Sequence, residues 1–263
     1  MSMLAQQPVR FNWAVIVDNL PLFFAGLRLT IVIAAVSFLI ATVLGVMVAL
    51  ARLSRFRIVA VLAAGYINVL RAIPLLVFIV FVYYGIAIFF NLTFLTAIQA
   101  GMLAFSLQYS AWLGEIFRSG IQAVPKGQRE AALSVGMSRA QTFVTVVLPQ
   151  AVRIAIPPTG NMMVGMIKDS SLVYILGVPE LFRNAQLLAN RTFRYFEVYL
   201  AVVITYLLLT TGVYYAMKFL ERRLEPRDLL ATGVPAWSPF ARRRQARLQR
   251  VQEQVREGVV AAI

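Results

Sequence analysis

The sequence predicts an all-α integral membrane protein with five transmembrane helices, its N-terminus outside and its C-terminus inside. Of its 263 residues, 60% are apolar and only 14% are charged, whereas soluble domains are usually about half apolar and a quarter charged. Several apolar stretches reach the roughly 20 residues that a helix needs to cross a bilayer core. Lys and Arg residues fall mainly between and after these stretches.

Five stretches are long and apolar enough to span, because backbone groups in lipid must find hydrogen-bond partners inside a helix. They cover about Phe23–Ala51, Ile58–Phe90, Thr96–Phe117, Gln150–Ile167 and Val198–Phe219. Pro74 interrupts the second stretch, and Pro157 with Pro158 forms a second expected break in the fourth, because proline removes a helical hydrogen bond.

The spans form one transmembrane domain, residues 1–226, followed by a basic tail, residues 227–263. Basic residues concentrate in the loops after the first and third spans and in the tail, which predicts a cytoplasmic location for these segments. The first 20 residues lack the pattern of a cleavable signal, so the first span is expected to remain as an anchor. Outside, Pro179 is expected in the first turn of a short helix.

The composition excludes several kinds of chemistry. The chain has no cysteine and no histidine, which removes thiol chemistry and zinc sites built on either residue. No paired acids support an intramembrane enzyme. The net charge of +14 lies on loops and tail, so it indicates topology and nucleic acid is not an expected partner. No Gly-x-x-x-x-Gly-Lys-Ser/Thr loop is present to hold nucleotide phosphates.

The loop between the third and fourth spans has the features of a short helix followed by a sharp turn. Pro125 suits the first helical turn, and Gly136 suits a helix end with left-handed backbone. Ser138 is a good N-cap for a second helix. Ala131 and Ala132 keep one patch of the first helix small, which would let a partner approach closely.

This loop resembles the EAA motif of ABC-importer permeases. The match consists of Glu130-Ala131-Ala132, three residues, Gly136, nine residues, Val146, one residue, and Leu148-Pro149. The stretches Arg71–Leu76, Gly114–Ile121 and Lys168–Leu172 are similar to segments of the polar amino-acid importers within that group.

The resemblance implies a type I ABC-importer permease fold in a bacterial inner membrane, with a coupling helix at about residues 125–136. The residues implied in coupling to the ATPase are Pro125, Lys126, Gly127, Arg129, Glu130, Ala131, Ala132, Gly136, Leu148 and Pro149. The implied partners are two ATPase subunits, a second identical or homologous permease and an external amino-acid-binding protein. ATP and Mg would bind the ATPase, and this chain would carry no cofactor.

Polar residues and prolines within or beside the spans are candidates for the solute path. They are Arg71, Pro74, Pro157, Asn161, Lys168 and Asp169. Two interpretations of Arg71 stay open. It either snorkels or packs at the cytoplasmic edge, or faces the interior of the helix bundle as a path or gate residue. Likewise, the Pro157 region is either a kink satisfied by neighbouring helices or part of the passage. The resemblance places Lys168 and Asp169 at an external gate.

The alternative function is a secondary transporter or channel for a small polar solute. Such a protein needs ionisable residues well inside its spans. Glu115, Asp169 and Glu197 all lie near span ends, which disfavours coupling to a proton or sodium gradient. Together with the resemblance to ABC-importer permeases, this favours an ATP-driven permease for a polar amino acid.

Overall fold

The computed structural model describes residues 11–92 and 94–224, and every regular element in these ranges is helical. The predicted basic tail, residues 227–263, lies outside the described residues. Contacts divide the chain into residues 1–218 and residues 219–263, and the architecture described below is that of the first unit.

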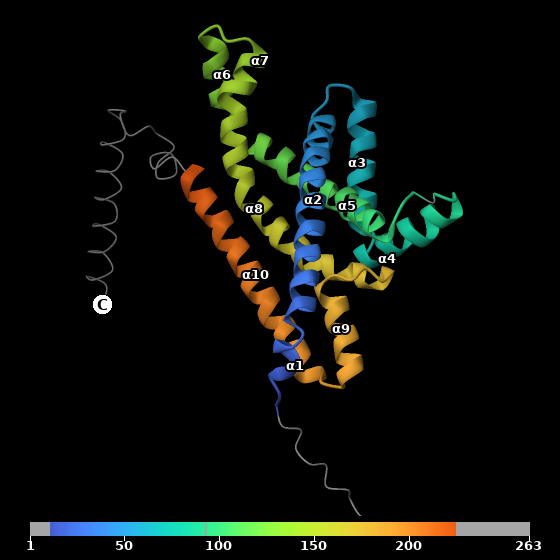
Figure 1. Cartoon of the computed structure of the whole chain (residues 1–263). Coiled ribbons are helices and arrows are strands. Elements are labelled where there is room, and N and C mark those ends of the chain that lie inside the picture. The colour runs from blue at the N-terminus through green and yellow to red at the C-terminus, as the bar shows by residue number, and fades with distance from the viewer. Residues whose placement is uncertain (1–10, 93, 225–263) are drawn as a thin grey trace, which may run out of the picture. The chain divides into compact units, whose positions relative to one another are not determined.

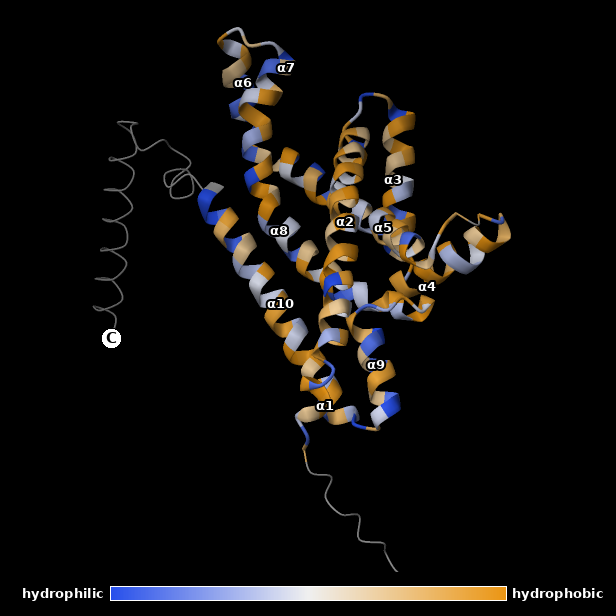
Figure 2. Cartoon of the chain, in the orientation of Figure 1, coloured by the Kyte–Doolittle hydropathy of each residue, from blue (hydrophilic) through white to orange (hydrophobic). Residues whose placement is uncertain are grey.

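Two long helices form an antiparallel hairpin near the start of the chain (Figure 1). After the single turn α1 (Ala14–Val17), α2 runs over Leu20–Arg52, with a proline in its first turn, and α3 runs over Arg57–Ala72. Apolar residues cover most of α2 (Figure 2). The predicted first span therefore lies within a helix that starts three residues earlier, because a proline is tolerated in a first turn.

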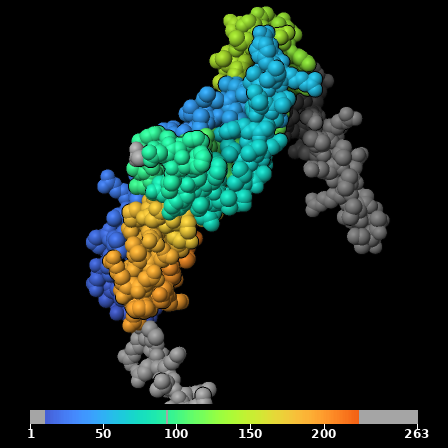
Figure 3. Space-filling view, turned by 90° about the vertical axis from the view of Figure 1, so that its right-hand side faces the viewer, coloured from blue at the N-terminus to red at the C-terminus, as the bar shows by residue number. Residues whose placement is uncertain are grey.

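The chain breaks sharply at Pro74, as the sequence predicts. Ile73 has an extended backbone, and α4 (Leu75–Val80) begins directly after Pro74. It continues as the π-helical segment η1 (Phe81–Ala87), and the axes before and after the break differ by 104°. Figure 3 shows α3 and the α4–η1 segment side by side on one surface of the molecule. The predicted second span is therefore a bent pair of helices.

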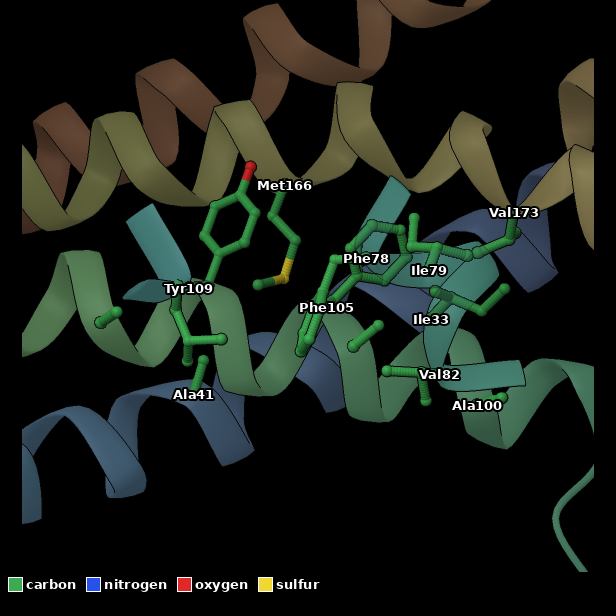
Figure 4. Packing of buried hydrophobic residues seen from close by; sticks show 14 of the residues in the cluster. Ile33, Ala41, Phe78, Ile79, Val82, Ala100, Phe105, Tyr109, Met166 and Val173 are labelled. Atoms are coloured by element: carbon green, nitrogen blue, oxygen red, sulfur yellow. The ribbon is translucent and has the colours of Figure 1, made fainter. Parts of the chain in front are cut away.

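The central helix is α5 (Ala97–Ala123), which packs against α2, α3 and α8. Two glycines bring α2 and α5 together: a Cβ added at Gly45 would lie 2.9 Å from the Leu113 Cβ, and one at Gly114 would lie 2.8 Å from a Val48 methyl. The side chain of Phe105 is fully buried in the apolar cluster around this contact (Figure 4). Small residues at this contact thus let the two backbones pack closely.

Four helical segments lie between α5 and the end of the predicted fourth span. They are α6 (Lys126–Ser134), α7 (Arg139–Gln141), the π-helical η2 (Thr142–Val147) and α8 (Leu148–Asp169). The expected break at Pro157 and Pro158 is wrong, because α8 runs through both prolines without interruption. The loss of two N–H donors is tolerated in a helix whose other hydrogen bonds remain and which packs against α5.

The last part of the chain returns along the bundle. A 3-10 helix, η3 (Ser170–Leu176), is followed by α9 (Leu181–Thr192) and α10 (Tyr195–Leu224). Figure 1 places α6 and α7 at one end of the bundle, and α9 beside the start of α2 at the other end. Pro179 precedes α9 by two residues rather than occupying its first turn.

By length and composition, three helical stretches in the described ranges are suited to cross a membrane. They are Leu20–Arg52, Arg139–Leu176 and Tyr195–Arg223, and the bent pair at Pro74 makes a fourth if it counts as one span. α5 has 27 residues, about 40 Å of helix, but polar residues such as Gln99 and Gln108 interrupt its apolar sequence. The predicted count of five spans therefore stays a prediction.

Candidate functional site

The segment that resembles the EAA motif contains a short helix with well-formed ends. α6 begins after Pro125, whose φ of −55° suits the entry to a helix. At its end, Gly136 has a φ of 85°. The Gly136 N–H donates to the Leu133 carbonyl at 3.0 Å, and the Met137 N–H donates to the Ala132 carbonyl at 3.2 Å. These two bonds form a Schellman motif, which needs a left-handed residue and so favours glycine at this position.

A hydrogen bond ties α6 to α5, and α6 packs against η2 on its other side. The Arg129 guanidinium donates to the Ile121 carbonyl at 3.1 Å, in the last turn of α5, where the helix dipole favours a cation. Ala132 is buried. On the far side, Ser138 and Gln141 form a reciprocal capping box at the start of α7, which confirms the predicted N-cap. The position of α6 is therefore set at both ends.

A small apolar cluster joins the base of this segment to the spans. It contains Ile121, Val124, Val147 and Ala151, with Phe143 packed against it. Leu148 and Pro149 follow directly as the first turn of α8. A displacement of α6 would thus reach α8 through η2, which packs against α6 and continues into α8.

The outer face of α6 is open to a partner. Glu130 and Ala131 are exposed, as are Lys126 and Gly127. Leu133 and Val135 are 45% and 78% exposed, although both are apolar. Leu133 and Val135 thus add exposed apolar surface near the end of α6.

A second group of polar side chains lies where α3 packs against α5. Gln108 of α5 donates to the carbonyls of Leu70 at 3.0 Å and Ile73 at 2.6 Å, which have no helical partner because Pro74 ends α3. The Arg71 guanidinium lies over the Trp112 ring, 4.1 Å from its centroid. The structure therefore brings Arg71 and Pro74 together with α5.

Farther along α5, Glu115 forms an ion pair with Arg118. The Arg118 Nε donates to one carboxylate oxygen at 3.0 Å, and a second guanidinium nitrogen contacts the other oxygen. Arg52 and Arg71 both lie within electrostatic range of this carboxylate. Three cations thus surround one acid.

The remaining predicted path residues lie on α8. The Tyr109 hydroxyl points out of the apolar cluster (Figure 4) and donates to the Asp169 carboxylate at 2.7 Å. Lys168 is exposed, and no ion pair joins it to Asp169 in the described part of the chain. Asn161 is exposed, and Pro157 lies inside the helix. The structure therefore links Asp169, but not Lys168, to α5.

A buried acid that the sequence did not predict as a functional residue, Glu180, lies at the start of α9. Glu180 is fully buried, and its carboxylate accepts hydrogen bonds from the N–H groups of Phe182 at 2.9 Å and Arg183 at 2.7 Å. The hydroxyls of Thr30 and Tyr206 donate to the same carboxylate at 3.3 Å. Burial raises the pKa of the Glu180 carboxyl, while these bonds oppose that rise. Glu180 thus joins α2, α9 and α10. In the sequence, its place directly before Leu181 is the one signal that could have suggested a helix N-cap.

Residues 41–226 match the protein family described as "Binding-protein-dependent transport system inner membrane component". The chain belongs to this family. It is therefore the membrane-spanning permease subunit of an ATP-driven importer, in which ATP hydrolysis is carried out by a separate subunit. No group of three metal-binding side chains occurs within residues 11–92 and 94–224.

Two relatives of this permease are named as amino-acid or glutamine permeases. It is 37% identical to the "Probable amino-acid permease protein YxeN" of Bacillus subtilis, over 76% of this chain and 89% of that protein. It is 32% identical to the "Glutamine transport system permease protein GlnP" of Escherichia coli, over 82% of this chain and 99% of that protein.

The fold of this permease matches solved transporter structures. A crystal structure of an amino acid ABC transporter with histidines aligns with a TM-score of 0.77 and 34% identity, covering 82% of this chain and 100% of that one. An inward-facing MetNI methionine ABC transporter aligns with a TM-score of 0.67 but only 15% identity, and so shows the fold alone.

Proposed function

We propose that this permease carries a polar amino acid into a bacterial cell across the inner membrane, through a path formed with a second identical or homologous permease. Two ATPase subunits act from the cytoplasm, and a binding protein delivers the amino acid from outside. The amino-acid substrate is supported by the relatives named for amino-acid and glutamine transport.

The observation that carries the coupling role is the geometry of α6. The helix is short, exposed, closed by Gly136 and packed against η2, which leads directly into α8. An ATPase that binds the outer face of α6 and moves on closing around ATP would displace α8 and change access to the path. The residues proposed to bind the ATPase or transmit its motion are Pro125, Lys126, Gly127, Arg129, Glu130, Ala131, Ala132, Gly136, Leu148 and Pro149.

Uptake by proteoliposomes is the test of this function. We expect accumulation of an amino acid such as L-glutamine when ATP and Mg are enclosed with the ATPase on the inner face and the binding protein is outside. Omission of ATP or of the binding protein should lower the initial rate at least about tenfold, because neither the motion nor the delivery then occurs. The measurement is radiolabel uptake. Uptake that persists without the ATPase and collapses with an ion gradient would instead support a secondary transporter.

We also propose five spans, with α5 as the third and with α6 in the cytoplasm. The chain has no cysteine, so single cysteines report sidedness without background. We expect Gln128→Cys, on α6, to react with a membrane-impermeant maleimide only from the cytoplasmic side, and Asn190→Cys, on α9, only from outside; both residues are exposed. The buried control Ala104→Cys should react from neither side. Labelling of both exposed cysteines from the same side would contradict this topology.

A further inference from the structure

Arg71 is exposed within a segment that the proposed topology places in the membrane. It lies in the last turn of α3, and the chain enters α3 at Arg57, next to the end of α2. Fourteen residues of helix place Arg71 about 21 Å from Arg57. With the α2–α3 turn at the cytoplasmic surface and α3 along the membrane normal, Arg71 would lie within the hydrocarbon core, which is about 30 Å thick. An exposed cation within the core is costly in lipid, and such residues usually face the interior of a helix bundle or a water-filled path.

The position of Arg71 is fixed from two directions. Gln108 binds the Leu70 carbonyl just before it and the Ile73 carbonyl just after it, so the last turn of α3 is tied to α5. The Trp112 ring lies beneath the guanidinium at 4.1 Å. A ring below the guanidinium plane attracts the cation and leaves its N–H edges directed outward. Arg71 is thus held with its donors available to a ligand.

No carboxylate in the described part of the chain forms an ion pair with Arg71. The nearest acid in electrostatic range, Glu115, already pairs with Arg118. The group of Arg52, Arg71, Arg118 and Glu115 therefore has a net charge of +2 by simple count. A cluster with this charge favours an anionic group at its open edge, and a guanidinium fork fits a carboxylate with two parallel hydrogen bonds.

We propose that Arg71 binds the α-carboxylate of the transported amino acid as it passes through the membrane. This inference rests on the proposed function and adds the group that the path recognises. Such recognition leaves the side chain of the transported amino acid unbound, whether that side chain is neutral or charged. The path therefore selects amino acids as a class, through the α-carboxylate that they share.

The test is direct binding to the purified permease–ATPase complex without the binding protein. The candidate probes are radiolabelled L-glutamine, L-glutamate and L-histidine, and each is compared with its own α-carboxamide. The comparison is made for an amino acid that wild-type proteoliposomes take up. For Arg71→Met we expect about a 100-fold loss of affinity for the free amino acid. Arg71→Lys, which keeps the charge but not the fork, should lose about 10-fold. Binding of the carboxamide should not weaken in either variant, because it has no carboxylate to lose.

The matched control is Arg55→Met. Arg55 is also exposed and also lies over an aromatic ring, that of Phe56 at 4.9 Å, but outside the α3–α5 contact. Arg55→Met should bind the free amino acid as the wild type does, and thermal unfolding of each variant checks that it is folded. The inference is overturned if Arg71→Lys and Arg71→Met keep wild-type affinity, if amino acid and carboxamide lose affinity equally, or if Arg55→Met shows the same loss. Wild-type uptake of no amino acid would instead count against the proposed function.

Discussion

Replacing Glu180 with alanine is expected to lower the free energy of unfolding by at least about 3 kcal/mol. The change leaves two backbone N–H groups at the start of α9 without their acceptor, together with the hydroxyls of Thr30 and Tyr206. Each buried donor without a partner costs about 1–3 kcal/mol. The measurement is the apparent unfolding temperature of the purified complex, which should fall by about 5–10 °C.

The control for this loss is Asp18→Ala. Asp18 is exposed between α1 and α2, and its carboxylate makes no hydrogen bond or ion pair in the described part of the chain. Its replacement should leave the unfolding temperature within about 1 °C of the wild type, because surface substitutions without partners change stability little. An equal effect of the two replacements would show that the Glu180 cluster does not join α2, α9 and α10 in the way described.

The pKa of Glu180 adds a dependence on pH to the same measurement. Because burial raises this pKa, the folded chain holds the proton more tightly than the unfolded chain does. As pH rises from the ordinary glutamic acid value through the raised one, the folded state loses stability relative to the unfolded state. Glu180→Gln, which cannot titrate, should show a smaller decrease over that interval. The reverse slope would contradict the assignment of burial as the dominant cause.

Replacing Ala131 with leucine is expected to weaken ATPase binding by about 10- to 100-fold. Ala131 is exposed on the proposed docking face of α6, one turn before the exposed apolar side chain of Val135. Extra methylene groups in a closely packed contact cost about 1–3 kcal/mol, and each 1.4 kcal/mol is a factor of ten in affinity. The measurement is the amount of ATPase that co-purifies with the permease, followed by the uptake rate.

Ala123→Leu is the matched control. Ala123 is also an exposed alanine, but it ends α5 instead of lying on the outer face of α6. It should retain the ATPase and transport at the wild-type rate. If Ala131→Leu kept full assembly and uptake, the outer face of α6 would not be the docking surface, whatever the resemblance of its sequence.

Features that depend on a few neighbouring residues could be predicted. The turn at Gly136 and the cap at Ser138 follow from local backbone and hydrogen-bond preferences. The break at Pro74 is of the same kind. Pro157 and Pro158 show the limit of such reasoning. The missing N–H groups are local, but whether the helix continues depends on the packing of neighbouring helices around it, and α8 does continue.

Contacts between residues distant in sequence could not be predicted. Gln108 is one polar residue among many in the spans, and nothing local shows that it reaches the carbonyls freed at Pro74. The same holds for Trp112 beneath Arg71, for Tyr109 on Asp169, and for Thr30 and Tyr206 around Glu180. Each pairing depends on how whole helices cross.

The sequence by itself determined that this is a helical membrane protein with the motif of an importer permease. Apolar length, the positions of basic residues and the spacing from Glu130 to Pro149 suffice for that, because each is a property of a single segment. Only the tertiary structure decided which polar groups meet. The bend at Pro74 and the α3–α5 contact leave Arg71 exposed above Trp112, and the close approach of α9 to α2 at Gly26 buries Glu180.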